Sequence, residues 1–97
     1  MFTKYNNTLV DYGHDVCLGN VGEQFDYEVE FGFGMGTRCK NVPKEEALQY
    51  VLGYCVANDL SCRDIQFSTS QWLMGKSLDQ FLPLGKYLVT REEVGDP

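Results

Sequence analysis

The stretch Tyr27-Glu28-Val29-Glu30-Phe31-Gly32-Phe33-Gly34 alternates between two kinds of residue without a break. Apolar side chains occupy every odd position, and carboxylates followed by glycines occupy every even one. Because successive side chains of a β-strand point to opposite faces, the pattern predicts a half-buried strand within residues 25–36. Its aromatic face needs a core to cover it, and the glycines leave the other face bare enough for a ligand or another backbone to approach.

Glu28 and Glu30 lie two positions apart on this predicted strand, so their Cα atoms are separated by about 6.6 Å. At that spacing both carboxylates can converge on one cation from the same face of the strand. Acidic side chains on the solvent face of an amphipathic strand give the same pattern. The pair by itself therefore leaves both interpretations open.

A second polar cluster follows the apolar run 50–56, which is typical of a buried strand or of the end of a helix. Residues 56–66 bring together amides, acids and a guanidinium, and Gly75-Lys76-Ser77 adds an ammonium shortly afterwards. Functional residues often lie where a buried element delivers the chain into a loop. A solvated turn after a strand is the alternative interpretation.

The remaining segments predict a few further elements. We expect short strands at Thr8-Leu9-Val10 and 86–90, an amphipathic helix within 42–52 that Gly53 ends, a loop over 67–74, and helical turns after Asp59 and at 90–93. In the helix, Pro43 suits the first turn, and the apolar stripe consists of Ala47, Leu48, Val51 and Leu52. His14 is the single histidine, lies in a predicted loop and is assigned no role.

Length and composition narrow the class of protein. Ninety-seven residues predict one domain, and 43% hydrophobic residues predict a globular one. A formal charge of −6 argues against a nucleic-acid partner, and no apolar run is long enough to predict a membrane span. The N-terminus lacks a signal-peptide pattern, and the four cysteines show no Cys-x-x-Cys pairing. We therefore expect reduced thiols, no structural zinc and a cytoplasmic protein.

Four motifs occur in order along the chain: Asp-Tyr-Glu-x-Glu from residue 26, Gly-Tyr-x-x-Ala-Asn-Asp-x-Ser-x-Arg-Asp-x-Gln from 53, Gln-Trp-x-x-Gly-Lys-Ser from 71, and Pro-Leu-Gly from 83. Together they resemble the fumarylacetoacetate hydrolase family, and the match runs from about Asn6 to Pro97. The family resembled consists of divalent-metal enzymes that act on acylpyruvates, related diketo acids and 2-oxo acids.

The resemblance implies that Glu28, Glu30 and Asp59 are metal ligands. Three carboxylates repel one another unless a cation neutralises them, and oxygen-only ligation fits Mg²⁺ or Mn²⁺, with Ca²⁺ also compatible, better than zinc. The resemblance further implies that Arg63, Gln66 and Lys76 bind the substrate and that Lys76 is catalytic, supporting substrate charge near the metal. An ion pair of Arg63 with Asp64 or another nearby acid, and a solvated Lys76, are the alternatives.

The fold implied is α+β, mostly β, with the mixed layered sheets of the family's C-terminal domain, and residues 1–97 are expected to form a partial catalytic domain of this type. The family's catalytic domain is longer, with an upstream histidine–glutamate pair and further strands downstream. We therefore expect a chain cut at both ends, with its sheets incomplete. Cys62 stands where the family usually has alanine.

The function expected from the resemblance is divalent-metal-dependent hydrolysis of carbon–carbon bonds in acylpyruvates or related 2,4-diketo acids. Decarboxylation or tautomerisation of oxaloacetate, and isomerisation of unsaturated 2-oxo diacids, stay open within the family. A truncated, non-catalytic chain that binds metal or associates with itself is the alternative of another class. We expect a small-molecule substrate, a homodimer or higher assembly, and poor turnover or none by the 97 residues alone.

Overall fold

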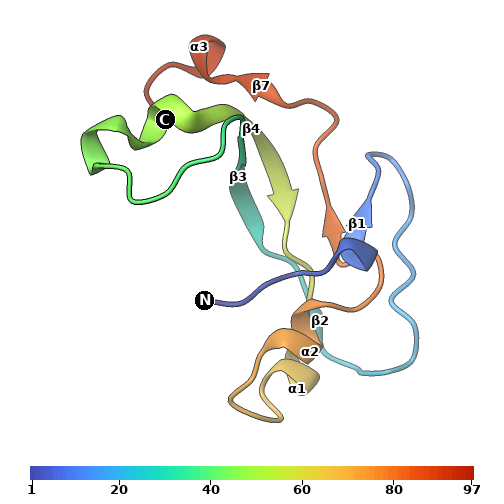
Figure 1. Cartoon of the computed structure of the whole chain (residues 1–97). Helices are drawn as coiled ribbons and strands as arrows, with labels where there is room; N and C mark the ends of the chain where they lie inside the picture. Colours follow the sequence, from blue (N-terminus) through green and yellow to red (C-terminus); the bar gives the residue numbers. More distant parts are fainter.

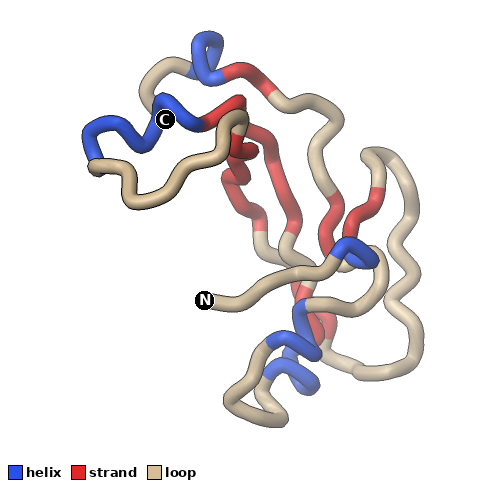
Figure 2. Tube along the Cα trace, in the orientation of Figure 1, coloured by secondary structure: helices blue, strands red, loops and turns tan.

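The computed structural model describes all 97 residues, Met1–Pro97. Three small sheets are joined by short helices and long connections (Figures 1 and 2). The first sheet pairs β1 (Leu9–Val10) with β6 (Leu82–Pro83) in parallel, and the second pairs β2 (Phe25–Asp26) with β5 (Ser61–Cys62) in antiparallel orientation. The third has the order β3 (Val29–Met35), β4 (Val51–Asn58), β7 (Val89–Thr90). The predicted α+β class, with mostly strands, is confirmed.

The antiparallel pair of β3 and β4 is the longest regular unit of the molecule, and it runs through the middle of Figure 1. Glu30 pairs with Ala57 on one face of this pair, and Phe31 pairs with Val56 on the other. The alternation predicted for this stretch is therefore correct. The predicted strand over 25–36 is interrupted at Tyr27 and Glu28, where the chain passes from β2 to β3.

The helix predicted within 42–52 is wrong in type and in its end. A 3₁₀ helix, η2, spans Lys44–Tyr50, and Val51 already begins β4. Gly53 does not end a helix: it lies inside β4, opposite Gly34, where an added Cβ would lie 2.3 Å from the carbonyl oxygen of Val89. Pairing with β3 and β7 makes residues 51–56 of the apolar run a strand, and only Tyr50 belongs to the preceding helix. Of the two interpretations of this run, the buried strand is therefore correct.

The shorter elements are close to the predictions. Thr8 belongs to the 3₁₀ helix η1 (Asn6–Thr8), so the first strand has only the two residues of β1, and the strand predicted at 86–90 is reduced to β7. The helical turn predicted near the C-terminus is α3 (Arg91–Val94). The turn predicted after Asp59 is α1 (Arg63–Gln66). The loop predicted over 67–74 is shorter than expected, because α2 (Leu73–Lys76) begins within it.

Most of the buried residues gather around the polar cluster. Only 12 of the 97 residues are buried, and five of the 12 are polar or charged: Thr8, Asp59, Ser61, Gln66 and Lys76. The aromatic face of β3, by contrast, is not covered within this chain, since Phe31 and Phe33 are 60% and 62% exposed. All four cysteines are free thiols, and no helix is long and apolar enough to cross a membrane. The polar site is therefore also the most enclosed part of the molecule.

Candidate metal and substrate site

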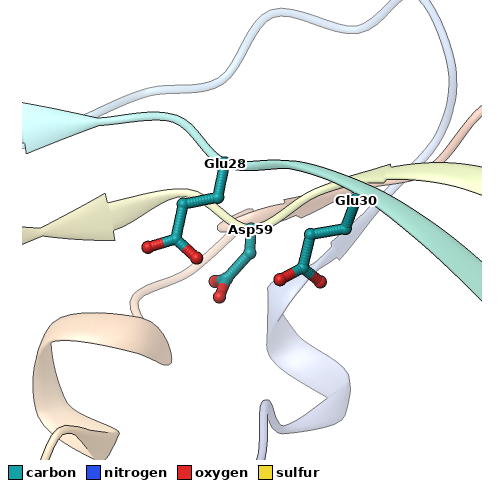
Figure 3. Close-up of side chains that lie close together, drawn as sticks. All are labelled: Glu28, Glu30 and Asp59. Carbon is teal, nitrogen blue, oxygen red and sulfur yellow. The ribbon is translucent and has the colours of Figure 1, made fainter.

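Three carboxylates meet where β3 begins and β4 ends. Glu28 precedes β3, Glu30 is its second residue, and Asp59 directly follows β4. One oxygen from each side chain lies within 4.8 Å of the other two, and all three carboxylates extend to the same side of the strands (Figure 3). The backbone N–H of Asp59 donates to the carbonyl of Glu28 at 2.9 Å, which fixes the two segments against each other.

The three acids differ in their surroundings. Asp59 is 2% exposed, Glu28 is half-buried, and Glu30 is exposed. The pKa of Glu28 is lowered from 4.5 to about 2, chiefly because Lys76 donates a hydrogen bond to its carboxylate; burial acts in the opposite direction, and Arg63 adds to the lowering. Glu28 is therefore an anion at neutral pH.

Lys76 is the central cation of the cluster. Its Nζ donates to Oε1 of Glu28 at 2.7 Å and to Oδ2 of Asp59 at 2.8 Å, and the residue is 1% exposed. Gly75 lets α2 approach α1 closely enough to place it there, since an added Cβ would lie 2.5 Å from the backbone nitrogen of Gln66. The solvated lysine that was the alternative interpretation is not what the structure contains.

Arg63 and Gln66 lie one turn apart on α1 and share a hydrogen bond, from Nη1 to Oε1 at 2.9 Å. The same Nη1 lies 2.7 Å from Oε1 of Glu28. Nε and Nη2 donate to Oδ2 of Asp26 at 3.0 and 2.7 Å, and the pKa of Asp26 is lowered mainly by these bonds. Arg63 thus forms the ion pair with a nearby acid that was its alternative interpretation, although the partners are Asp26 and Glu28 and not Asp64. The structure brings together all six residues that the sequence singled out.

Two members of the cluster were not predicted. Lys4 Nζ lies 2.6 Å from Oδ1 of Asp59, although Lys4 precedes the predicted strand Thr8-Leu9-Val10 and belongs to none of the motifs. Asp26 opens the first quoted motif but was given no role, because nothing local indicates that it reaches Arg63. Both contacts join segments distant in sequence, so no spacing pattern could have revealed them.

The residues fit a hard divalent cation. All three candidate ligands offer carboxylate oxygen, which Mg²⁺ and Mn²⁺ prefer. Oδ1 of Asp59 is buried and accepts no hydrogen bond, even though the Lys4 ammonium is close, because the three N–H donors of Lys4 all go to backbone carbonyls. A buried carboxylate oxygen with free lone pairs is a donor atom suited to a metal.

Comparison with known proteins gives the family. The model of the fumarylacetoacetate (FAA) hydrolase C-terminal domain matches residues 1–97. A mitochondrial oxaloacetate tautomerase of Xenopus laevis is 37% identical over 99 residues, covering 100% of this chain and 31% of the relative. The chain spans about a third of the length of such curated relatives.

Two solved structures have the same fold over most of the chain. A 5-carboxymethyl-2-hydroxymuconate delta-isomerase from Mycobacterium smegmatis superposes with a TM-score of 0.86 at 34% identity, covering 90% of this chain and 35% of that one. A fumarylpyruvate hydrolase from Pseudomonas aeruginosa, solved with Mn²⁺ and pyruvate, gives a TM-score of 0.86 at 26% identity, covering 94% of this chain and 42% of that one. The resemblance seen in the motifs is thereby confirmed: the chain belongs to the fumarylacetoacetate hydrolase family.

Proposed function

We propose that this chain carries the metal- and substrate-binding residues of a divalent-metal-dependent hydrolase that cleaves carbon–carbon bonds in acylpyruvates or related 2,4-diketo acids. The observation that carries the proposal is the meeting of Glu28, Glu30 and Asp59 within 4.8 Å. Lys76 is bound to Glu28 and Asp59, and Arg63 is bound to Glu28. The similar fumarylpyruvate hydrolase, which acts on a compound of this class, supports it.

Glu28, Glu30 and Asp59 would hold Mg²⁺ or Mn²⁺, and Mn²⁺ is the ion in the similar hydrolase. When bound, such an ion supplies Lewis-acid polarisation of the oxygens of a 2-oxo acid. The charges of the site agree with an anionic substrate. Its four acids, Asp26 included, exceed its three cations by one charge, so a divalent ion would leave the cluster with a net charge of +1.

The site residues that are not candidate metal ligands each have a role in substrate binding that their chemistry suits. Arg63 is 24% exposed in its side chain, and its planar donors match a substrate carboxylate. Gln66, bonded to Arg63, offers an amide that both donates and accepts. Lys76, held among the carboxylates, places an ammonium where negative charge develops on the leaving enolate.

Two related reactions compete with the hydrolase proposal. The Xenopus relative is an oxaloacetate tautomerase, and the Mycobacterium smegmatis structure is an isomerase of an unsaturated diacid. The same charges would serve each reaction, because Arg63, Gln66 and Lys76 meet the 2-oxo acid group that these substrates share. The part of the substrate molecule outside the 2-oxo acid group decides which reaction takes place.

A non-catalytic chain that binds metal is the candidate of another class. It is favoured by the small core, since only 12 of the 97 residues are buried. Under this alternative the metal would bind and pyruvate would bind with it, while no product would form.

Product analysis tests the proposal. The purified chain is incubated with Mn²⁺ and acetylpyruvate, oxaloacetate or an unsaturated 2-oxo diacid, and binding of pyruvate is measured in parallel with and without Mn²⁺. We expect metal-dependent pyruvate binding and release of pyruvate from acetylpyruvate, both lost in Asp59→Asn and kept in Lys40→Met, an exposed lysine. Pyruvate binding that is equal without metal would contradict the proposal, and binding without any product would favour the non-catalytic chain.

A further inference from the structure

Lys4 is a buried cation to which neither the motifs nor the proposed reaction gives a task. Its side chain is 6% exposed, and its Nζ lies 2.6 Å from Oδ1 of Asp59. The residue reaches this place from the N-terminal segment, which precedes every motif residue of the site. A lysine is among the residues least often fully buried, so its position calls for a reason.

The hydrogen bonds of Lys4 join three segments that build the site. Its Nζ donates to the carbonyls of Leu60 and Phe81, each at 2.9 Å, and to the carbonyl of Lys76. Leu60 follows Asp59 after β4, Lys76 is the last residue of α2, and Phe81 precedes β6. One ammonium therefore fixes the backbone beside Asp59 and the backbone of Lys76 to the same point.

The contact with Asp59 differs in kind from the contact that Lys76 makes. Lys76 donates a hydrogen bond to Oδ2 of Asp59, whereas Oδ1 accepts none. An ammonium has three N–H donors, and those of Lys4 are used by the three carbonyls. Lys4 consequently gives Asp59 a compensating charge at 2.6 Å, while its hydrogen bonds hold the surrounding backbone.

We propose that Lys4 is a positioning residue of the metal centre. It fixes the ligand Asp59 and the substrate lysine Lys76 relative to each other, and it compensates the charge of the buried carboxylate. The inference rests on the proposed metal site. Residues that orient a metal ligand from outside the coordination sphere typically change metal affinity by about 10- to 100-fold when they are replaced.

The experiment measures Mn²⁺ affinity by titration of free Mn²⁺ in electron paramagnetic resonance, on the full chain and at a temperature where each variant is folded. Lys4→Met removes the charge and the three hydrogen bonds. Lys4→Arg keeps the charge but replaces the compact ammonium by a larger planar group, which cannot make the same three contacts. Lys40→Met removes an exposed lysine, and Thr8→Val perturbs a buried residue of the same N-terminal segment that touches no carboxylate of the site. Thermal unfolding without metal is recorded for every variant.

We expect Lys4→Met to weaken Mn²⁺ binding about 10- to 100-fold, Lys4→Arg to weaken it less, and both controls to bind as the wild type does. If Lys4→Met does not fold, Lys4→Arg still decides, since affinity equal to that of the wild type would overturn the inference. So would a loss in Thr8→Val as large as that in Lys4→Met, because general destabilisation would then explain both. A wild type that binds no Mn²⁺ would overturn the proposed metal site and this inference together, whereas unchanged binding in Lys4→Met overturns the inference alone.

Discussion

Glu30 is the candidate ligand whose replacement tests metal binding without changing the stability of the metal-free fold. It is exposed and forms no ion pair, whereas Glu28 and Asp59 are both held by lysines. A ligand that binds only the folded state stabilises it, by about 2.7 kcal/mol at a hundredfold excess over the dissociation constant. We therefore expect Mn²⁺ to raise the melting temperature of the wild type, and Glu30→Gln to lose most of that shift while its metal-free melting temperature stays unchanged.

Thermal melts with Mn²⁺ and with a chelator measure this. Glu45→Gln, which removes an exposed glutamate from η2, is the matched control and should keep the full shift. A shift in Glu30→Gln equal to that of the wild type would exclude Glu30 as a ligand. A metal-free melting temperature lowered by the substitution would mean that Glu30 stabilises the fold itself.

Asp64 makes a pH-dependent contribution to stability away from the metal ligands. Its carboxylate accepts hydrogen bonds from the Cys62 thiol at 2.9 Å and from the backbone N–H groups of Glu23 and Gln24 at 3.0 and 3.3 Å. These bonds, that of the thiol above all, lower the pKa of Asp64 from 3.8 to about 2. Because the folded state has the lower pKa, the contribution is complete above pH 3.8 and is lost as the pH falls towards 2.

We expect Asp64→Asn to be less stable than the wild type at pH 6, and the difference to shrink as the pH falls from about 4 to 2. Urea unfolding in chelator at several pH values measures the two free energies of unfolding. The other acids titrate alike in both proteins, so the difference isolates Asp64. A difference that stays constant down to pH 2 would show that the hydrogen bonds of Asp64 do not depend on its charge.

The residues that could be predicted were those whose spacing carries information. The period of a strand places Glu28 and Glu30 on one face, and one turn of helix brings Arg63 and Gln66 together. The roles of all six site residues, Asp59 and Lys76 included, were implied by the family resemblance and not by spacing. Lys4 could not be found, because its contacts depend on how the N-terminal segment crosses the ends of β4 and α2. Local periodicity gives the face on which a residue lies, and only the fold gives its distant partners.

At the scale of elements, the contact of α2 with α1 decides where Lys76 lies. An added Cβ on Gly75 would come within 2.5 and 2.6 Å of N and Cα of Gln66, and within 2.7 Å of the carbonyl oxygen of Cys62. These are backbone atoms, so the clash is relieved only by moving α2 away from α1. We expect Gly75→Ala to cost about 1–3 kcal/mol of stability and to displace Lys76 from Glu28 and Asp59.

Urea unfolding measures the loss of stability, and Mn²⁺-dependent pyruvate binding reports on Lys76. Gly34→Ala is the control, because its nearest neighbour would be Cδ1 of Leu88 at 3.8 Å, an ordinary contact, and its backbone is in the common region. Wild-type stability and binding in Gly75→Ala would show that the two helices adjust freely, and that their close contact does not position the lysine.

Elements were predictable where one period extends over many residues. The strict alternation of 27–34 identified β3, whereas 42–52 fits both a helical stripe and the start of a strand. Pairing of Val51–Asn58 with β3 decides that ambiguity, and such pairing is a tertiary effect. The two-residue strands β1 and β6 pair with each other although they lie far apart in the sequence. Local sequence patterns therefore could not predict how long these strands are.

The whole molecule is extended for its length. Its radius of gyration is 15.4 Å, whereas a compact domain of 97 residues has about 12.5 Å, and its principal extents are 43 × 31 × 20 Å. Most of the few buried residues gather near the acids, whereas Tyr54 is buried on the opposite face of the β3–β4 pair, stacked on Phe31. A core of this size supplies little hydrophobic stabilisation, so ligands and association should affect stability strongly.

The other side of the pair presents what we term the apolar face, composed of Val29, Phe31, Phe33, Met35 and Val56, all of them exposed. A contiguous patch of large apolar side chains favours association, and we expect at least a dimer in solution.

Phe33→Lys should shift the chain towards monomer and leave Mn²⁺ affinity unchanged, because strand alternation points Phe33 away from Glu30. Light scattering over a range of concentrations measures the mass, with Tyr12→Lys, an exposed aromatic residue outside the apolar face, as control. A wild type that stays monomeric throughout, or a Tyr12→Lys variant that dissociates as readily as Phe33→Lys, would show that this face does not drive association.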